Sequence, residues 1–450
     1  MSTRANPPRT CAAARANTRG RRLVRGLAGA GAAGLVAGLL TSCGGGAEAG
    51  GRGPVTLDFY APPTPPVAYQ AAADRCSKQS GGEYRIHLIK LPAQADGQRQ
   101  QMVRRLAAED ASMDILGMDI TWEAEFAEAG WIEPWPADLA AKVKKGTLQS
   151  AIDTGMWEGK LYAAPYVTNV QLLWYRKDLV KEPPKTWDEM ITMAEKLAEQ
   201  GKPHYVEIQG AQYEGAVVWF NTLVHSAGGS ILTEDSSAAA LGDPALKALQ
   251  IMKRLADSPA SDPSLSNAIE EDTRLAMEAG RAAFELNWPY VWPAMQADQP
   301  KVNGKNLAKV FAWAPYPAVH PGEPVHVTTG GLDLAVSHFS QHKRLAFKAA
   351  ACIRSYQNQK QSAIKGGLAP TLKDLYINPP PKFKKLYPFY QVIYDELQHS
   401  VNRPKTPAYQ SVSIVVSHLV SPPREINPPE TLAAMREQIG DALNSKGLIP

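Results

Sequence analysis

Three apolar runs decide the fold: VTLDFY at residues 55–60, YRIHLIKL at 84–91 and MDILGMD at 113–119. The first two alternate like half-buried β-strands, and the third is typical of a more buried strand. A helix carrying Cys76 is predicted between the first two strands, and residues 98–110 are predicted to form a second helix. This βαβαβ order predicts an α/β fold with a parallel sheet and right-handed crossovers.

The strand ends point to a ligand site, because ligands of parallel sheets bind beyond the carboxyl ends of the strands. Tyr60 and Asp119 end the first and third predicted strands, so both are expected to face a cleft. Farther along, TWDE at residues 186–189 has the pattern of a capping box. It predicts the start of a helix that Gly201 ends.

Residues 1–42 are predicted to be a signal peptide. They contain seven arginines and no acidic residue, and their apolar run, 27–40, is shorter than the roughly 20 residues of a membrane-spanning helix. The run ends in LTSC (40–43), which resembles a bacterial lipobox. Cys43 is therefore the predicted lipidation site and the first mature residue, and residues 43–53 form a glycine-rich, flexible tether.

Two acyl chains on Cys43 would anchor the protein at the outer face of a cell membrane. The alternative is a plain secretory signal followed by a buried cysteine. The pair Arg21-Arg22 leaves open whether export uses the general or the twin-arginine route.

The charge of the mature body excludes one class of partner. Of the 48 basic residues, seven lie in the signal peptide, which leaves 41 against 44 acidic residues. A body with this balance has no bulk attraction for the phosphates of nucleic acid. The full chain has a charged fraction of 20% and a hydrophobic fraction of 44%, which are those of a folded protein with one or two cores.

The cysteines predict one disulfide. Cys11 leaves with the signal peptide and Cys43 is lipidated, so the body keeps Cys76 and Cys352 in an oxidising compartment. Two separately buried free thiols are the alternative.

The chain has no Ser elbow, nucleotide loop, H-E-x-x-H or paired C-x-x-C motif. His338 and His342 have helical spacing, but no cysteine or carboxylate accompanies them, which favours an exposed polar face over a metal site. Two carboxylates acting as a glycosidase pair stay an alternative. The 10 Trp and 16 Tyr, against 9 Phe, suit surfaces that stack on sugar rings and hydrogen-bond at the ring edge.

Several motifs distributed over the whole mature chain are best considered together. They are DITW (119–122), FAEAGW (126–131), YAAP (162–165), LWYRKDL (173–179), EG (214–215), VWFNTL (218–223), SAGGS (226–230), NWPY (287–290), GGL (330–332) and RPKTPAY (403–409). Together they resemble the sugar-binding proteins of ABC importers, in the maltose/trehalose family of extracellular solute-binding proteins, and most of all the mycobacterial trehalose-binding lipoproteins.

The resemblance implies a two-lobed, periplasmic-binding-protein-like α/β fold with the ligand cleft between the lobes. By analogy the first lobe comprises residues 54–166 and 331–370, and the second comprises 167–330 and 371–450. Both body cysteines then lie in the first lobe, which strengthens the prediction of a disulfide between them.

The function implied by the resemblance is that of an extracytoplasmic, lipid-anchored and monomeric binding protein, without enzyme activity or cofactor. It would bind trehalose or a related α-glucosyl disaccharide by lobe closure and deliver it to the permease subunits of an ABC importer. The alternatives are the same fold binding maltose, a malto-oligosaccharide or another glycoside, and a lipid-anchored glycoside hydrolase.

Seven residues are the main candidates for ligand binding. Asp119 offers an ionised acceptor for two sugar hydroxyls, with a helix N-cap as its alternative role. The resemblance implies six others. Asn169 is an amide that both donates and accepts hydrogen bonds, and Trp288 is an aromatic platform with the ring of Tyr290 at its edge. Gly330 and Gly331 allow the sugar to approach the backbone, and the guanidinium fork of Arg403 spans two hydroxyls.

A purely structural role is the alternative for each of these residues: a turn for Asn169, core packing for Trp288 and Tyr290, a hinge for the glycines, and a surface ion pair for Arg403. A second tier of residues is expected near the same cleft edges: Tyr60, Asp96, Gln171 and Glu285. Where some family members have an aromatic residue after the glycine pair, this chain has Leu332, which favours a disaccharide over longer malto-oligosaccharides.

Overall fold

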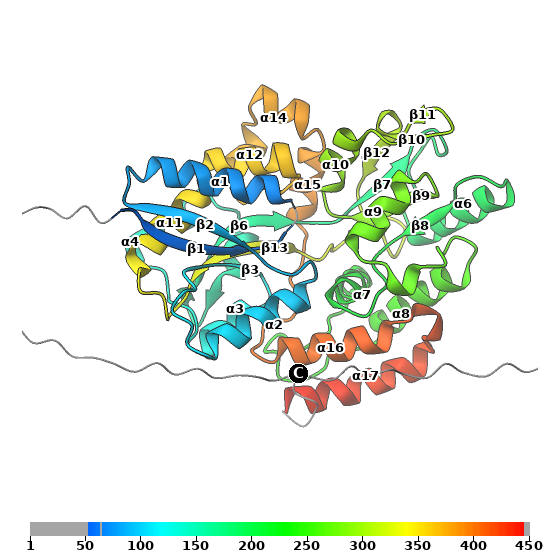
Figure 1. Cartoon of the computed structure of the whole chain (residues 1–450). Helices are drawn as coiled ribbons and strands as arrows, with labels where there is room; N and C mark the ends of the chain where they lie inside the picture. The colour runs from blue at the N-terminus through cyan, green and yellow to red at the C-terminus, as the bar shows by residue number, and fades with distance from the viewer. Residues whose placement is uncertain (1–52, 64, 445–450) are drawn as a thin grey trace, which may run out of the picture. The chain divides into compact units, whose positions relative to one another are not determined.

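The computed structural model describes residues 53–63 and 65–444 (Figure 1). The predicted signal peptide, the lipidation site Cys43 and most of the tether lie outside these residues. Among the helices that are described, none has both the length and the apolar composition needed to span a membrane.

A five-stranded mixed sheet contains the predicted βαβαβ unit. Its strand order is β2-β1-β3-β13-β6, with β1 at Val55–Ala61, β2 at Tyr84–Lys90, β3 at Ile115–Asp119, β6 at Ala163–Asn169 and β13 at Gly330–Val336. Strand β1 pairs in parallel with both β2 and β3, which confirms the predicted parallel unit. Strand β13 is antiparallel to β3 and to β6, so a distant segment inserts between two strands of the first 170 residues.

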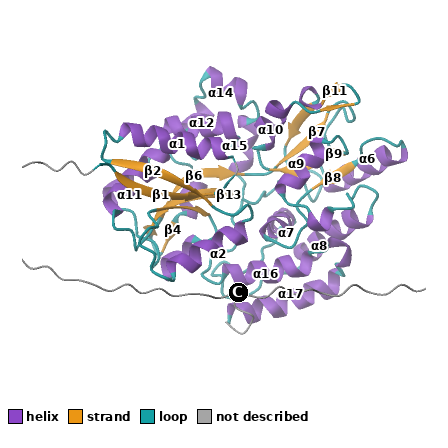
Figure 2. Ribbon diagram, in the orientation of Figure 1, coloured by secondary structure: helices purple, strands orange, loops and turns teal. Residues whose placement is uncertain are grey.

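Helices cover both faces of this sheet (Figure 2). The side chains of Leu57 and Phe59 on β1 pack in one core with α1 (Pro66–Gln79) and α11 (Lys343–Ile353). The core on the other face contains Tyr60 and side chains of α2 (Ala95–Leu106) and α3 (Glu123–Glu128).

Helix α2 starts and ends earlier than the sequence predicts. It ends at Leu106, because the chain turns there and Glu109 has a φ of 55°, a left-handed conformation that an α-helix does not contain.

A second sheet has the strand order β12-β7-β9-β8 and a single large core of its own. The strands are β7 (Leu172–Arg176), β8 (Tyr205–Glu207), β9 (Ala282–Asn287) and β12 (Phe311–Ala314). Helices of this half are α6 (Trp187–Glu199), α7 (Glu214–Ser226), α8 (Asp243–Asp257), α9 (Glu270–Glu278), α10 (Val291–Asp298), α15 (Tyr390–Leu397), α16 (Tyr409–Val420) and α17 (Pro428–Leu443). The remaining elements include α4 (Ala137–Lys144), α5 (Gln149–Thr154), α12 (Tyr356–Gly366), α13 (Asp374–Ile377) and α14 (Pro381–Leu386).

The predicted capping box begins α6, with one difference in its bonding. The Thr186 hydroxyl accepts a hydrogen bond from the Glu189 backbone N–H, as expected. The Glu189 carboxylate accepts from the N–H of Lys185, one residue before the cap. Both contacts still satisfy backbone donors around the start of the helix.

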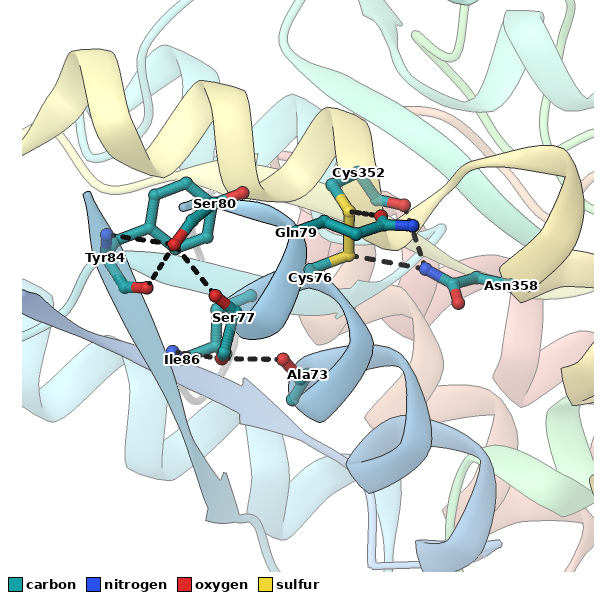
Figure 3. Close-up of a disulfide and its surroundings, with 9 residues drawn as sticks. All are labelled: Ala73, Cys76, Ser77, Gln79, Ser80, Tyr84, Ile86, Cys352 and Asn358. Carbon is teal, nitrogen blue, oxygen red and sulfur yellow. Dashed lines mark hydrogen bonds between the residues drawn. A yellow bond between two sulfur atoms is a disulfide. The ribbon is translucent and has the colours of Figure 1, made fainter. Parts of the chain in front are cut away.

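The two body cysteines form a disulfide between α1 and α11 (Figure 3). Their Cα atoms are 5.8 Å apart, although 276 residues separate them in sequence. Asn358 donates a hydrogen bond to the Cys76 sulfur and another to the Cys352 carbonyl. The bond therefore joins the N-terminal βαβ unit to the helix that follows β13.

Strands β6 and β13 are the places where the chain leaves and re-enters the first sheet. The chain passes from Asn169 at the end of β6 to Leu172 at the start of β7, and it returns at Gly330. A third segment crosses nearby, since Val401 forms a bridge with Thr328. Three segments thus meet at the edge of the first sheet. The exact boundaries of the two lobes remain predictions.

Candidate functional site

The register of β13 assembles the candidate residues of the first sheet. Gly330 lies opposite Asn169 of β6, and Leu332 lies opposite Asp119 of β3. An antiparallel strand between two strand ends therefore brings a carboxylate, an amide and a glycine pair to one edge of the sheet.

A cavity of about 230 Å³ opens at this edge. All seven main candidates line it: Asp119, Asn169, Trp288, Tyr290, Gly330, Gly331 and Arg403. A larger hollow, about 740 Å³, lies around residues 338–345, away from these strand ends and lined mostly by exposed or half-buried side chains. The smaller cavity is the candidate site because it combines buried charge, amide and aromatic groups.

Arg403 is the centre of a buried charge network in this cavity. Its residue is only 4% exposed. Nη1 donates to Oε1 of Glu214 at 2.6 Å, and Nη2 donates to Oδ1 of Asp119 at 3.0 Å. The guanidinium thus joins the end of β3 to the start of α7. Arg403 is therefore buried and does not form the exposed surface ion pair that was its alternative role.

Glu214 is held from three sides. Besides Arg403, the hydroxyls of Tyr409 and Ser413 on α16 donate to its two carboxylate oxygens. Burial raises the pKa of Glu214, and the charge of Arg403 acts in the opposite direction. Burial also opposes the charge on Arg403, but Asp119 and its other neighbours outweigh that effect and raise its pKa, so the guanidinium stays charged.

Asp119 keeps one oxygen available to a ligand. Its Oδ1 accepts from Arg403 and from the backbone N–H and hydroxyl of Thr121. Within the described part of the chain, Oδ2 accepts no hydrogen bond. The side chain closes a local turn and does not cap α3, whose N-cap residue is Trp122. Asp119 is therefore both a fixed partner of Arg403 and a free acceptor.

The glycine pair allows a close approach of side chain and backbone. A Cβ on Gly330 would lie 2.6 Å from Cη2 of Trp288, so the indole covers the backbone at this position. A Cβ on Gly331 would lie 2.4 Å from the carbonyl oxygen of Val167. Only glycine fits at either position, and at Gly330 the missing Cβ is what seats Trp288 in the cavity.

We expect Gly330→Ala to weaken ligand binding at least tenfold while lowering stability by only about 1–3 kcal/mol, the usual cost of overpacking. The added methyl group would displace the indole, which can move because it is a side chain. Calorimetry and thermal unfolding measure the two effects. Gly440→Ala is the matched control, because nothing lies within 4 Å of that position and alanine suits its helix. Equal affinities for Gly330→Ala and wild type would contradict this role.

The wall opposite the first sheet is acidic and aromatic. The Tyr213 hydroxyl donates to Oε2 of Glu270 at 2.7 Å. The Tyr290 hydroxyl is buried and has no hydrogen-bond partner within the described residues. Burial, reinforced by Glu271 and Glu270, raises the pKa of Tyr290, so it remains a neutral donor. The Tyr290 hydroxyl and the Nε of Arg403 are thus buried donors, on residues that line the cavity, without a partner among the described residues.

The four second-tier candidates do not line the cavity. Tyr60 lies in the core formed with α2 and α3, where the guanidinium of Arg105 covers its ring. It is not the last residue of β1, which continues to Ala61, and alternate side chains of a strand point to opposite faces of the sheet. Gln171 is buried and donates to Gln209. Asp96 accepts from the N–H of Glu214 and from Gln410, so it joins α2 to α7 and α16 beside the cavity.

Glu285 lies within the second sheet, 0% exposed, where one carboxylate oxygen accepts from Asn287. Burial raises the pKa of Glu285 to about 8. The folded state therefore holds a proton that the unfolded state releases near its ordinary pKa of 4.5. Stability must then fall as the pH rises from about 4.5 to about 8.

We expect Glu285→Gln to reduce this loss, giving a variant roughly 1–4 kcal/mol more stable than wild type at pH 8 and nearly equal to it at pH 4.5. Denaturant unfolding at both pH values measures it, and ligand affinity should not change. Glu199→Gln, at an exposed position, is the control. Parallel pH profiles of Glu285→Gln and wild type would show that this carboxyl is not protonated in the folded protein.

Sequence reasoning missed the residues that enter the cavity at helix starts. Glu214 and Glu270 are the first residues of α7 and α9, and Glu271 and Tyr213 lie beside them. Carboxylates at helix N-termini are common for electrostatic reasons alone, so the signal in the sequence is weak. The EG motif at 214–215 was part of the resemblance without an assigned role.

Comparisons with known proteins agree with this geometry. Among solved structures, the chain is similar to the maltose-bound MalE3 of T. maritima, with a TM-score of 0.77 and 27% identity over 86% of this chain and 99% of that one. The GacH receptor of Streptomyces glaucescens has the same fold, with a TM-score of 0.76, 21% identity and coverage of 87% and 99%. The fold is thus that of the two-lobed, MalE-like solute-binding proteins.

Residues 89–360 match the bacterial extracellular solute-binding protein family, and the chain belongs to that family. It is also 29% identical to a protein of Deinococcus radiodurans named "Probable ABC transporter-binding protein", over 74% of this chain and 79% of that one. The protein is accordingly a substrate-binding protein of an ABC transporter and not an enzyme, and its fold is that of the maltose-type sugar-binding proteins.

Proposed function

We propose that the cavity binds trehalose or a closely related α-glucosyl disaccharide, and that the protein, anchored through a lipid on Cys43, delivers this sugar to its permease. The observation that carries the proposal is the buried Arg403, fixed between Asp119 and Glu214 in a cavity that also contains Trp288 against a glycine backbone. Directional charged groups beside an aromatic face suit a sugar, which has hydroxyls at its rim and apolar C–H faces.

The size of the ligand is inferred from Leu332. This residue lines the cavity where an aromatic side chain would extend the stacking surface for longer chains. A maltose-type ligand is the second candidate, because the similar MalE3 structure contains maltose. The two disaccharides share glucose rings and differ in linkage, so the same groups could serve either.

Closure is supported by hydrogen bonds that join segments of the two halves. Asp119 and Asp96, from β3 and α2, contact Arg403, Gln410 and the start of α7. A ligand that also hydrogen-bonds to both sides would favour the closed form over an open one. We expect an affinity around micromolar, about −8 kcal/mol, which permits both capture and release.

The test is calorimetry of residues 44–450 against trehalose, maltose, sucrose and glucose, followed by analysis of the recovered sugar. Tight binding of trehalose with the disaccharide intact is the expected result. Binding of a different sugar would keep the importer function and change the substrate. Mass spectrometry of the protein from its native membrane tests the diacylglycerol on Cys43 separately.

A further inference from the structure

Charge is distributed unevenly in the second half of the chain. Residues 343–385 contain ten lysines and arginines and one acidic residue, Asp374, although the mature body as a whole is slightly acidic. Those on α11 are partly neutralised, because Lys343 pairs with Glu133 and Lys348 pairs with Glu83. The exposed lysines without a carboxylate partner among the residues described therefore lie farther along the chain: Lys365 on α12, Lys373 just before α13, and three lysines on α14.

Helix α14 carries three of these lysines on its outer side. Phe383 is fully buried and packs against the rings of Tyr387 and Tyr390, which fixes the helix to the body. Lys382, Lys384 and Lys385 are exposed, and none of them has a carboxylate within 4 Å in the described part of the chain. Figure 1 shows α14 projecting beyond α12 at the top of the view.

Apolar side chains accompany the lysines. Leu386 at the end of α14 is 39% exposed, and Ile377 at the end of α13 is 53% exposed. Lys373, just before α13, is also exposed, while Asp374 accepts a hydrogen bond from Asn378. Lysines 373, 382, 384 and 385 with Ile377 and Leu386 are called the lysine face below.

We propose that the lysine face docks on an anionic lipid surface and sets the orientation of the anchored protein. Each lysine of such a cluster increases the affinity of a protein for an anionic membrane roughly fivefold. Exposed Leu and Ile side chains enter the headgroup region, and the apolar stems of the lysines extend so that their charged ends stay in water. The proposal rests on the proposed lipidation of Cys43. From Cys43 to Pro54 the tether spans at most about 40 Å, which keeps the body at the membrane so that weak contacts are sufficient.

The experiment uses residues 43–450 coupled through the Cys43 thiol to a maleimide lipid, since the other two cysteines are joined in the disulfide. Hydrogen exchange of residues 373–386 is compared on vesicles of phosphatidylcholine alone and on vesicles with one-third phosphatidylglycerol. We expect slower exchange only on the anionic vesicles, reversed by about 0.5 M salt, because screening removes the attraction.

Lys382→Gln/Lys384→Gln/Lys385→Gln should abolish the protection, and for untethered protein it should lower affinity for anionic vesicles about a hundredfold. Lys181→Gln/Lys196→Gln/Lys309→Gln is the matched control, with the same change in charge at exposed lysines outside the lysine face. Equal exchange on both kinds of vesicle, or protection lost equally in both triple variants, would overturn the proposal. Protection that requires membrane proteins in neutral lipid would assign the face to a protein partner and also overturn it.

Sugar affinity is measured on the same samples. Failure of vesicle docking with normal sugar binding would reject the lysine face alone. Absence of sugar binding with normal docking would reject the proposed ligand, and a mature protein without a lipid on Cys43 would reject the anchor.

Discussion

Arg403→Ala should reduce ligand affinity at least a hundredfold and lower the stability of the protein by about 3–5 kcal/mol. The substitution removes the cation between Glu214 and Asp119 and leaves a buried carboxylate without its charged partner, which is the costly way to break a buried pair. The substitution also releases the Asp119 carboxylate, which Arg403 holds at the cavity through Oδ1. Calorimetry with the sugar that binds wild type, together with thermal unfolding, measures both effects.

Because the stability loss of Arg403→Ala is itself large, Arg403→Lys provides the second measurement. Lysine keeps the charge but cannot reach two carboxylates with a planar fork. We expect this variant to be folded and to bind at least tenfold more weakly. Arg436→Ala on α17 is the matched control, because among the described residues its guanidinium hydrogen-bonds only to the Leu241 carbonyl and pairs with no carboxylate. Folded Arg403 variants with affinities within about threefold of wild type would remove Arg403 from the site.

Removing the disulfide should have the second largest effect. Cys76→Ala/Cys352→Ala should lower the free energy of unfolding by about 2–5 kcal/mol, because the bond closes a long loop of 276 residues and restricts the unfolded chain. Ligand affinity well below the unfolding temperature should stay close to that of wild type, since neither cysteine lines the cavity.

Reduction of the wild-type protein provides the control for this prediction. A thiol reductant should lower the Tm of wild type to near that of the double variant and leave the variant unchanged. If wild type and the double variant unfold at the same denaturant concentration, the bond contributes nothing to stability and the expectation is wrong.

The first sheet shows how far local patterns predict this fold. Alternation over 55–60 and 84–91 identified β1 and β2, and the order of elements predicted their parallel pairing with β3. Those signals are local, because the period of a strand is set by its own residues. The antiparallel insertion of β13 between β3 and β6 depends on a contact across about 200 residues, and no short pattern specifies it.

The candidate site was predictable where a residue ends a strand or matches a family motif. Asp119, Asn169 and Arg403 are such residues, and all three line the cavity. Tyr60 and Glu285 were misplaced because a strand end does not reveal which face of the sheet its last side chains occupy. Glu214 was missed because its role appears only when Arg403, 189 residues later, reaches it.

The sequence by itself determined the α/β class, the parallel βαβαβ unit, the pair of cysteines available for a disulfide and the set of residue types suited to a sugar. The tertiary structure alone decided which of those residues share one cavity, because side chains from β3, β6, α7 and a segment near residue 400 meet only after two sheets have packed. It also decided that the charge of Arg403 is buried between two acids and that the charge of α14 is exposed. Burial and neighbouring charge, which fix the energy of an ionised side chain, are properties of the folded chain and not of any segment of it.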